Sequence, residues 1–365
     1  MIFRRFSLVI LAAAAIFLSG CTSPKAGPSI PQPVLRFAIM GDTQNVALQD
    51  PSTANIPQLT RTVMDIASLS PRPTVCFLTG DLVMNFADDQ GQTLTTQLDA
   101  LQVAYSSMPG ADTFKLIPIM GNHESDSYDL AHQYFYPNPY IYQRWTNWIA
   151  QYHYDTYAGS GPTPAGDPQD FLVMDERKFS YSFTLNGVCF IVVNTDTLTS
   201  IVDPATSKPY VGWIPLHWIE DELIRAQANP LVSHIFVVGH RPVEAPSWST
   251  PADDITPILN NATYPLATDL ENAMKSCSKV RGYLCSHVHV QDMMQLQGGG
   301  GVWQIVSGNA GAALLPGWNP PGGQYFGFMV VNVYLGGRVS VVNYTRPASS
   351  VPPPAAVPGP EIFIH

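Results

Sequence analysis

Residues 114–124 read FKLIPIMGNHE, an apolar run that ends abruptly in Gly-Asn-His-Glu. A short run of this kind is typical of a β-strand that is buried on both faces. In layered α/β proteins, ligands bind beyond the carboxyl ends of such strands. This stretch therefore predicts a buried strand together with a cluster of candidate site residues at its end.

The same pattern occurs elsewhere along the chain. Apolar runs end at Gly-Asp-Thr-Gln-Asn, Gly-Asp, Asn-Thr-Asp, Gly-His-Arg-Pro and Ser-His-Val-His; these runs are residues 34–40, 74–79, 188–193, 235–238 and 282–285. Helical patterns separate several of them, at residues 57–69, 94–106, 214–227 and 266–277. Alternating strands and helices predict an α/β layered domain. The last runs have no helical pattern between them and predict an antiparallel closing sheet; they are residues 302–307, 326–333 and 339–344.

The strand ends carry oxygen and nitrogen donors. They are Asp42, Gln44, Asp81, Asn122, His240, His287 and His289. Such a set suits Mn, Fe or Zn better than Ca, and it is too large for one tetrahedral ion. A single Asp after a strand is more typical of a helix cap, but caps do not explain clusters at successive strand ends. Two ions sharing a carboxylate can activate water and stabilise displacement at phosphorus.

The order Asp-x-Gln, Gly-Asp, Gly-Asn-His-Glu, Gly-His and His-x-His, between residues 42 and 289, resembles the calcineurin-like metallophosphoesterase superfamily. The resemblance implies a β-sandwich flanked by helices, with a dinuclear metal site at the carboxyl ends of the strands. It further implies hydrolysis of a phosphomonoester or phosphodiester by a metal-bridging hydroxide. Two divalent ions would be the cofactor, and a phosphoester small molecule or a phosphorylated molecule the substrate.

The resemblance also implies a role for each residue. The first metal would bind Asp42, Gln44, Asp81 and His289, and the second Asp81, Asn122, His240 and His287, so that Asp81 bridges them. His123 would act at the substrate as a catalytic residue, and Glu124 would orient it. Asn45 and Arg241 are candidate substrate contacts, although a structural role for Arg241 is equally consistent with the sequence.

Three positions depart from the family pattern. Gln44 stands where His is usual, which predicts a softer first metal site and motivates the alternative of a non-catalytic or single-metal binding lipoprotein with this fold. Ser286 replaces a usual Gly and is tolerated if its φ stays negative. Met84 stands where purple acid phosphatases carry a Tyr ligand, which argues against that branch.

The termini differ in composition from the rest of the chain. Residues 1–20 combine Arg4 and Arg5 with a short apolar run and small residues before Cys21, which is typical of a lipoprotein signal peptide. Acylation of Cys21 would anchor an exported protein to a bacterial membrane, on the periplasmic side or at the cell surface. Residues 21–33 are expected to form a Pro/Ser-rich tether, residues 34–346 one catalytic domain, and residues 347–365 a Pro-rich tail. Residues 347–360 of this tail are not expected to form a regular element.

Composition limits the partners. The chain has 18 Lys and Arg against 28 Asp and Glu, a net charge of −10, which argues against nucleic-acid binding and against a nuclease. The oligomeric state is left open. Cys76 and Cys189 lie in strand-like runs and are expected to be buried thiols, whereas Cys277 and Cys285 could pair. The aromatic-rich insertion at 125–179 forms either a subdomain with its own small core or a lid that stacks on the substrate.

Overall fold

A computed structural model describes residues 32–45, 50–85, 92–129, 134–248, 257–297 and 301–364. By its internal contacts the chain divides into Met1–Gln32 and Pro33–His365, and the fold below is that of the second unit. The expected signal peptide, Cys21 and nearly all of the tether lie outside the described residues. Within the described ranges, no helix has both the length and the apolar character needed to cross a membrane.

The first sheet has six strands in the order β16-β15-β14-β1-β2-β3. These are β1 (Leu35–Met40), β2 (Val75–Leu78), β3 (Lys115–Pro118), β14 (Tyr325–Val333), β15 (Val339–Pro347) and β16 (Val357–Phe363). Strands β1, β2 and β3 run parallel, whereas β14, β15 and β16 continue the sheet in antiparallel fashion. The parallel strands therefore end at the same edge of the sheet.

The second sheet also has six strands, in the order β12-β13-β11-β10-β7-β6. These are β6 (Tyr181–Leu185), β7 (Val188–Val192), β10 (His234–Val238), β11 (Val280–Cys285), β12 (Gln291–Gln295) and β13 (Trp303–Ser307). Strands β7, β10, β11 and β13 are parallel, and β6 and β12 are antiparallel edge strands.

The two sheets pack face to face through buried aromatic and branched side chains. Phe37 of β1 meets Phe190 of β7 edge to face, with ring centroids 5.0 Å apart, and Phe236 of β10 at 5.3 Å. Such inclined pairs stabilise a core beyond the burial of their area. Alternate residues of β1 face away from this layer: Ala38 and Met40 belong to a different core cluster.

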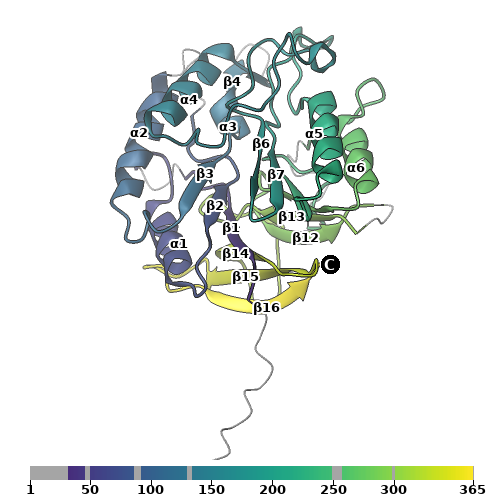
Figure 1. The fold of residues 1–365 in the computed structure, drawn as a ribbon. Helices are drawn as coiled ribbons and strands as arrows, with labels where there is room; N and C mark the ends of the chain where they lie inside the picture. Colours follow the sequence, from purple (N-terminus) through teal and green to yellow (C-terminus); the bar gives the residue numbers. More distant parts are fainter. Residues whose placement is uncertain are drawn as a thin grey trace, which may run out of the picture. The chain divides into compact units, whose positions relative to one another are not determined.

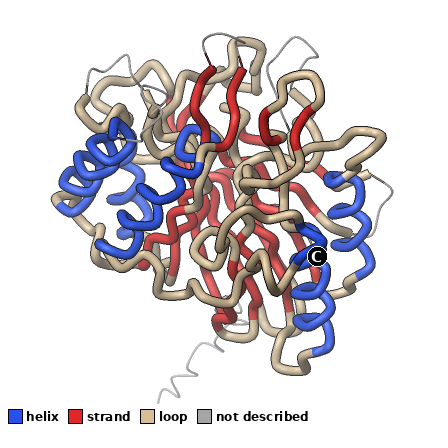
Figure 2. Tube along the Cα trace, turned by 90° about the horizontal axis from the view of Figure 1, so that it is seen from above, coloured by secondary structure: helices blue, strands red, loops and turns tan. Residues whose placement is uncertain are grey.

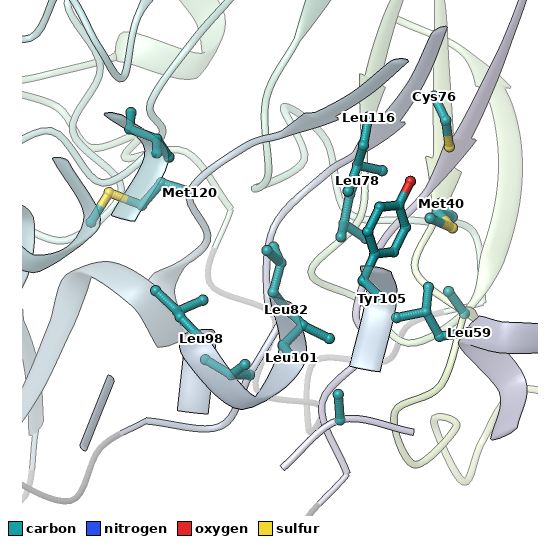
Figure 3. Packing of buried hydrophobic residues seen from close by; sticks show 14 of the residues in the cluster. Met40, Leu59, Cys76, Leu78, Leu82, Leu98, Leu101, Tyr105, Leu116 and Met120 are labelled. Atoms are coloured by element: carbon teal, nitrogen blue, oxygen red, sulfur yellow. The ribbon is translucent and has the colours of Figure 1, made fainter. Parts of the chain in front are cut away.

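Helices cover the outer faces of both sheets, as Figures 1 and 2 show. Against the first sheet lie α1 (Ile56–Ser68), α2 (Gln92–Ser106) and α4 (Pro139–Gln151), and against the second lie α5 (Leu216–Ala228) and α6 (Leu266–Ser276). Figure 3 shows Leu98 and Leu101 of α2 among Leu78, Leu82 and Leu116. The expected metallophosphoesterase-type sandwich flanked by helices is confirmed, and the four expected helices begin and end within two residues of the observed ones.

Two expectations about the C-terminal part were wrong. Strand β13 does not join a closing antiparallel sheet; it lies parallel to β11, because β12 reverses the chain between them. The tail is not without regular elements, since β16 pairs with β15. β16 lies at the edge of the sheet, where Pro358 and Pro360 can be accommodated although they lack an N–H.

The aromatic insertion packs into the main core. It contains a hairpin of β4 (Asp126–Asp129) and β5 (Tyr134–Pro137), then α4 and a short 3₁₀-helix, η2 (Pro168–Asp170). Tyr142, Trp145 and Trp148 of α4 share one cluster with residues of α2 and of the first sheet. The expectation of a separate small core is therefore not met.

The remaining small elements and the cysteines complete the fold. A second hairpin pairs β8 (Val202–Asp203) with β9 (Lys208–Pro209), and α3 (Asn122–Ser125) is a single helical turn. Cys76, Cys189, Cys277 and Cys285 are all buried and free, so the considered Cys277–Cys285 pairing is not formed.

Replacing Trp145 with Ala tests the place of α4 in the core. The side chain is 1% exposed, and loss of a buried Trp costs about 3–5 kcal/mol of folding free energy because a cavity remains. We expect urea unfolding to show this loss. Tyr140→Ala, on the same helix at 60% exposure, serves as the control, and an equal effect of both variants would contradict the packing.

Candidate metal centre

The polar residues that follow five strands meet at one edge of the two sheets. Asp42 follows β1, Asp81 follows β2, and Asn122 begins α3 just after β3. From the second sheet, His240 follows β10, and the pair His287 and His289 follows β11. Hydrogen bonds join the sheets here, including Ser307 Oγ to Ile39 O and Ala310 N to Gly41 O, each at 3.2 Å. Residues far apart in sequence thus form one site.

Four side chains form the group expected to hold the second metal. Asn122 Oδ1 lies 2.9 Å from both His240 Nε2 and His287 Nδ1, and these two ring nitrogens are 3.1 Å apart. Asp81 Oδ1 lies 3.2 Å from His240 Nε2. Asp81, His240 and His287 offer ligand atoms close enough together to hold one ion.

A second group adjoins the first through Asp81. Asp42, Asp81 and His289 also offer ligand atoms within reach of one ion. Gln44 Nε2 lies 3.2 Å from Asp81 Oδ2 and 3.3 Å from His289 Nε2. The two groups share Asp81, as a bridging carboxylate requires.

The donor atoms themselves indicate a cation. Both carboxylate oxygens of Asp42 and the Oε1 atom of Gln44 are buried without a hydrogen-bond partner. A buried carboxylate without a partner is very costly unless a cation is bound. The oxygen and nitrogen of an amide are interchangeable by a half-turn, which would direct Gln44 Oε1 toward Asp81 and His289. These residues fit divalent metal ions.

Burial and mutual repulsion set the charges of the carboxyl groups. Burial, together with the charge of Asp81, raises the pKa of Asp42 well above its usual range and that of Glu124 to about 8. Burial also opposes ionisation of Asp81, but the charges of His123 and His240 outweigh it and hold the pKa of Asp81 below its usual range. Asp81 is thus the most firmly ionised carboxylate of the three.

Backbone carbonyl groups fix two of the three metal-ligand histidines. Nδ1 of His240 donates to Thr79 O at 2.8 Å, and Nδ1 of His289 donates to Ala313 O at 2.7 Å. Each bond places the ring proton on Nδ1 and leaves Nε2 unprotonated for a metal ion. These two histidines are therefore oriented before an ion binds.

His123 lies beside the bridging carboxylate. Its Nδ1 atom donates to Met84 O at 2.8 Å, and its backbone N–H donates to Asp81 Oδ1 at 3.1 Å. Its Nε2 atom lies 3.7 Å from Asp81 Oδ2, and its side chain is 13% exposed. The ring thus lies next to the bridging carboxylate with Nε2 toward it, as the expected role at the substrate requires.

Glu124 has different partners from those expected. Its carboxylate accepts the backbone N–H groups of Asp81 and Gly121 at Oε2 and of Val83 at Oε1, each at 3.0 Å. These bonds tie the loop after β2 to the start of α3. Glu124 therefore holds the loop that carries the bridging Asp81, whereas Met84 O fixes the ring of His123.

The two candidate substrate contacts differ in position. Asn45 is half-buried and its Nδ2 atom donates to Gly311 O at 3.2 Å beside the first metal group. Arg241 is only 3% exposed, and its guanidinium pairs with Asp196 at 2.8 Å. The structure favours the structural alternative for Arg241.

Ser286 is accommodated as expected. The positive φ of this turn falls on the next residue, His287 (φ 67°), and not on Ser286. The Ser286 hydroxyl donates to Thr79 O and lies 3.1 Å from His240 Nδ1. The residue that replaces the usual glycine therefore contacts the group that orients His240.

One contributor was missed from the sequence. The loop after β13 supplies Ala313 O, and Gly308 allows it to approach Asp42: a Cβ there would lie 2.4 Å from Asp42 Oδ2. The signal was available in the Gly-Asn-Ala-Gly segment that follows the run at 302–307. This segment carries no ionisable side chain, so the sequence pattern alone did not identify it as part of the site.

Comparison with known proteins places this site. The calcineurin-like phosphoesterase family model matches residues 35–291, most of the chain. The chain belongs to the calcineurin-like phosphoesterase family. It is accordingly a metal-dependent hydrolase of phosphoester bonds, and its cofactor is a pair of divalent metal ions. No curated protein sequence matches the chain.

Solved structures share the fold. A dimetal phosphatase from Danio rerio is 14% identical with a TM-score of 0.53, over 91% of this chain and 99% of that chain. PhoD is 14% identical with a TM-score of 0.53, over 92% and 70%. Purple acid phosphatase PPD1 from yellow lupin (Lupinus luteus) is 17% identical with a TM-score of 0.51, over 85% and 51%. At these identities the likeness concerns the fold alone.

Metal removal should make folding stability sensitive to alkaline pH. The pKa of Glu124 is raised from 4.5 to about 8, so its stabilising proton is lost from the folded, metal-free protein as the pH rises through that value. Asp42 acts in the same direction. Above about pH 7 unperturbed histidines of the unfolded chain are already neutral. We expect chelated protein to lose thermal stability between about pH 7 and 8.5, and Mn²⁺ to reduce this loss.

Glu176 provides an internal control for this measurement. It is buried away from the metal groups, and burial raises its pKa to about 8 as well. Its contribution is present with and without metal, so the difference between chelated and Mn²⁺-loaded protein reports the site. Equal pH slopes in both states would contradict the assignment of a cation to these carboxylates.

Proposed function

We propose that the chain hydrolyses a phosphomonoester or phosphodiester at the dinuclear site formed by the strand ends. One observation carries the proposal: the unpartnered oxygens of Asp42 and Gln44 adjoin the bridging Asp81, next to a histidine whose Nε2 faces the site. Asp42, Gln44, Asp81 and His289 would hold one ion, and Asp81, Asn122, His240 and His287 the other. When bound, two such ions generate a nucleophile from water and neutralise charge on the phosphoryl group.

His123 would donate a proton to the leaving group. Because Met84 O fixes the proton of Nδ1, a second proton can be carried only at Nε2. Burial lowers the pKa of His123, although the charge of Asp81 opposes this. A phosphoryl anion beside Nε2 would also favour the charged ring. Substrate binding and protonation of His123 therefore support each other.

The rest of the site would position these groups. Glu124 holds the backbone of Asp81 and Gly121 together, and the carbonyl groups of Thr79 and Ala313 orient His240 and His289. Asn45, at the first metal group, is the candidate contact for the substrate. Preorganised groups of this kind need little rearrangement during the reaction.

The alternative is a protein of this fold that binds one ion and does not catalyse. Gln44 favours it, because its NH₂ group faces Asp81 and His289 in the present orientation. The two functions differ in metal content. A catalytic protein should bind two Mn²⁺ ions per chain, whereas the alternative should bind one at most.

A substrate panel tests the proposal directly. Protein loaded with Mn²⁺ is assayed on p-nitrophenyl phosphate and bis-p-nitrophenyl phosphate, with metal content measured on the same sample. We expect turnover of at least one ester and two ions per chain. No turnover together with fewer than two ions would support the non-catalytic alternative.

Replacing His123 with Ala should separate metal binding from catalysis. The side chain is not a ligand in this proposal, so both ions should remain while kcat falls by about 10²-fold or more, the usual scale for a positioned acid. His153→Ala, outside the site, is the matched control. Loss of a metal ion from the His123 variant would refute its role at the substrate.

We also propose that the protein is exported and held on a membrane by lipid on Cys21. The proposal is supported by the basic residues, the apolar run and the small residues that precede this cysteine. We expect Cys21→Ala to move the protein from the membrane fraction to the soluble fraction. Ser23→Ala should stay with the membrane. Membrane retention of the Cys21 variant would argue against lipid attachment.

A further inference from the structure

The peptide group between Met84 and Asn85 is held from both sides. Its carbonyl oxygen, Met84 O, accepts the Nδ1 proton of His123 at 2.8 Å. Its N–H group, on Asn85, donates to Gln97 Oε1 at 2.7 Å. Because a trans peptide is planar, these two bonds leave the same rigid unit in opposite directions. The position of the His123 ring therefore depends on a side chain of a different element, helix α2.

Thr53 adds a second connection to the same amide oxygen. Its hydroxyl accepts Met84 N–H at 2.8 Å and lies 3.0 Å from Gln97 Oε1. The hydroxyl also lies 2.7 Å from Ser52 O, but its single proton serves one acceptor. Donation to Gln97 is favoured, because otherwise two acceptor oxygens would face each other at 3.0 Å. Gln97 Oε1 thus accepts from Thr53 and from Asn85, and both N–H groups that flank Met84 are bound.

Both residues that contact Gln97 Oε1 have strained backbones. The φ value of Thr53 is 53° and that of Asn85 is 41°, in the left-handed region. This region is especially unfavourable for a β-branched residue such as threonine. Strained conformations of this kind persist only where surrounding groups fix them. Gln97 contacts both strained residues through one oxygen, so it is one of the groups that hold this loop in place.

Gln97 is itself fixed by the packing of α2. Its side chain is 8% exposed. The neighbouring residues Leu94, Leu98 and Leu101 are buried in the core shared with the first sheet, and Figure 3 shows the last two of them. Groups carried by a packed helix are placed more accurately than groups carried by a loop. The oxygen of Gln97 is therefore a rigid point of attachment for the loop that contacts His123.

We propose that Gln97 is a positioning residue that directs the ring of His123 by holding the peptide group between Met84 and Asn85. This inference rests on the role of His123 in the proposed function. A peptide group that donates through its N–H accepts more strongly at its carbonyl oxygen, because hydrogen bonds in series polarise one another. Gln97 therefore fixes the direction of Met84 O and strengthens its bond to Nδ1. Both effects keep Nε2 turned toward the site.

Two substitutions of Gln97 test the proposal on the full-length protein loaded with Mn²⁺. Gln97→Met keeps the size of the side chain but offers only a weak acceptor. We expect kcat to fall about 10–100-fold, because a small displacement of a catalytic group is costly, while KM changes little. Both Mn²⁺ ions should remain, since Thr53 and Asn85 are not proposed ligands. Gln97→Glu keeps an oxygen that accepts from both donors and should restore most of the activity.

Removal of His123 distinguishes positioning from a general structural role. If Gln97 acts through His123, Gln97→Met should lower kcat no further in a protein that already carries His123→Ala, because residues that act as a unit are not additive. An equal loss of kcat in both backgrounds would overturn the inference.

Nuclear magnetic resonance of ¹⁵N-labelled histidine gives a readout that does not depend on turnover. In Zn²⁺-loaded protein, the ring N–H signal that disappears in His123→Ala identifies this ring. Gln97→Met should make that N–H exchange faster with water, because its acceptor, Met84 O, is no longer held in place. An unchanged exchange rate would contradict the positioning role.

Gln102 offers a matched control on the same helix. It is half-buried, and its amide group contacts Tyr154 and Ser106. Gln102→Met should leave kcat and the exchange of the His123 ring proton unchanged. If it lowered kcat as much as Gln97→Met, the effect would reflect general destabilisation of α2 and the inference would be overturned. Thr53→Ala serves if Gln97→Met fails to fold, since it removes a hydroxyl of the same connection and should speed the same exchange.

The outcomes separate this inference from the proposed function. Unaltered protein that binds two ions and hydrolyses phosphoesters, with Gln97→Met equally active, would overturn the positioning role alone. Unaltered protein that binds fewer than two ions and shows no turnover would overturn both. A loss of kcat in Gln97→Met that vanishes in the His123→Ala background, with both ions retained, would support both.

Discussion

The structure depends on keeping buried carboxylates together at one edge of two sheets. Asp42, Asp81 and Glu124 are each at most 1% exposed, and like charges at close range oppose folding. Imidazole groups face Asp81, backbone N–H groups surround Glu124, and the oxygens of Asp42 have no protein partner. Divalent cations would neutralise the carboxylate charge that the protein groups leave unbalanced. The arrangement around the site therefore keeps these carboxylates together where the cations bind.

Backbone conformation shows the cost of bringing the ligands so close. Asp42, Asp81 and His287 have φ values of 57°, 52° and 67°, in the left-handed region that few side chains adopt. Gly80, at 94°, leaves no space for a Cβ, which would lie 2.3 Å from His240 Nδ1. Strain of this kind persists only where the surroundings fix it, and here strands buried in the sandwich lead directly into each turn.

The sequence was most informative where one local pattern decided the outcome. Five buried parallel strands are each followed closely by a candidate ligand, so residues 114–124 and their counterparts predicted these strands, several helices between them and the candidate ligands. The parallel pairing of β13 with β11 and the edge strand β16 were not predicted, because strand partners are chosen by long-range pairing. The partners of Glu124 and Arg241 were missed for the same reason: Val83 and Asp196 are distant in sequence, and no local spacing indicates them.

Arg241 illustrates how burial changes the meaning of a residue type. A basic residue directly after a metal ligand suggests a phosphate contact, but a guanidinium bound on both sides to buried carboxylates has little freedom to move toward a substrate. Its Nη1 atom lies 3.3 Å from His287 Nε2, and the backbone carbonyl of Asp196 accepts a hydrogen bond from Tyr142 of the insertion. The insertion is therefore connected through Tyr142 to the buried ion pair of Asp196 and Arg241 that lies next to the metal centre.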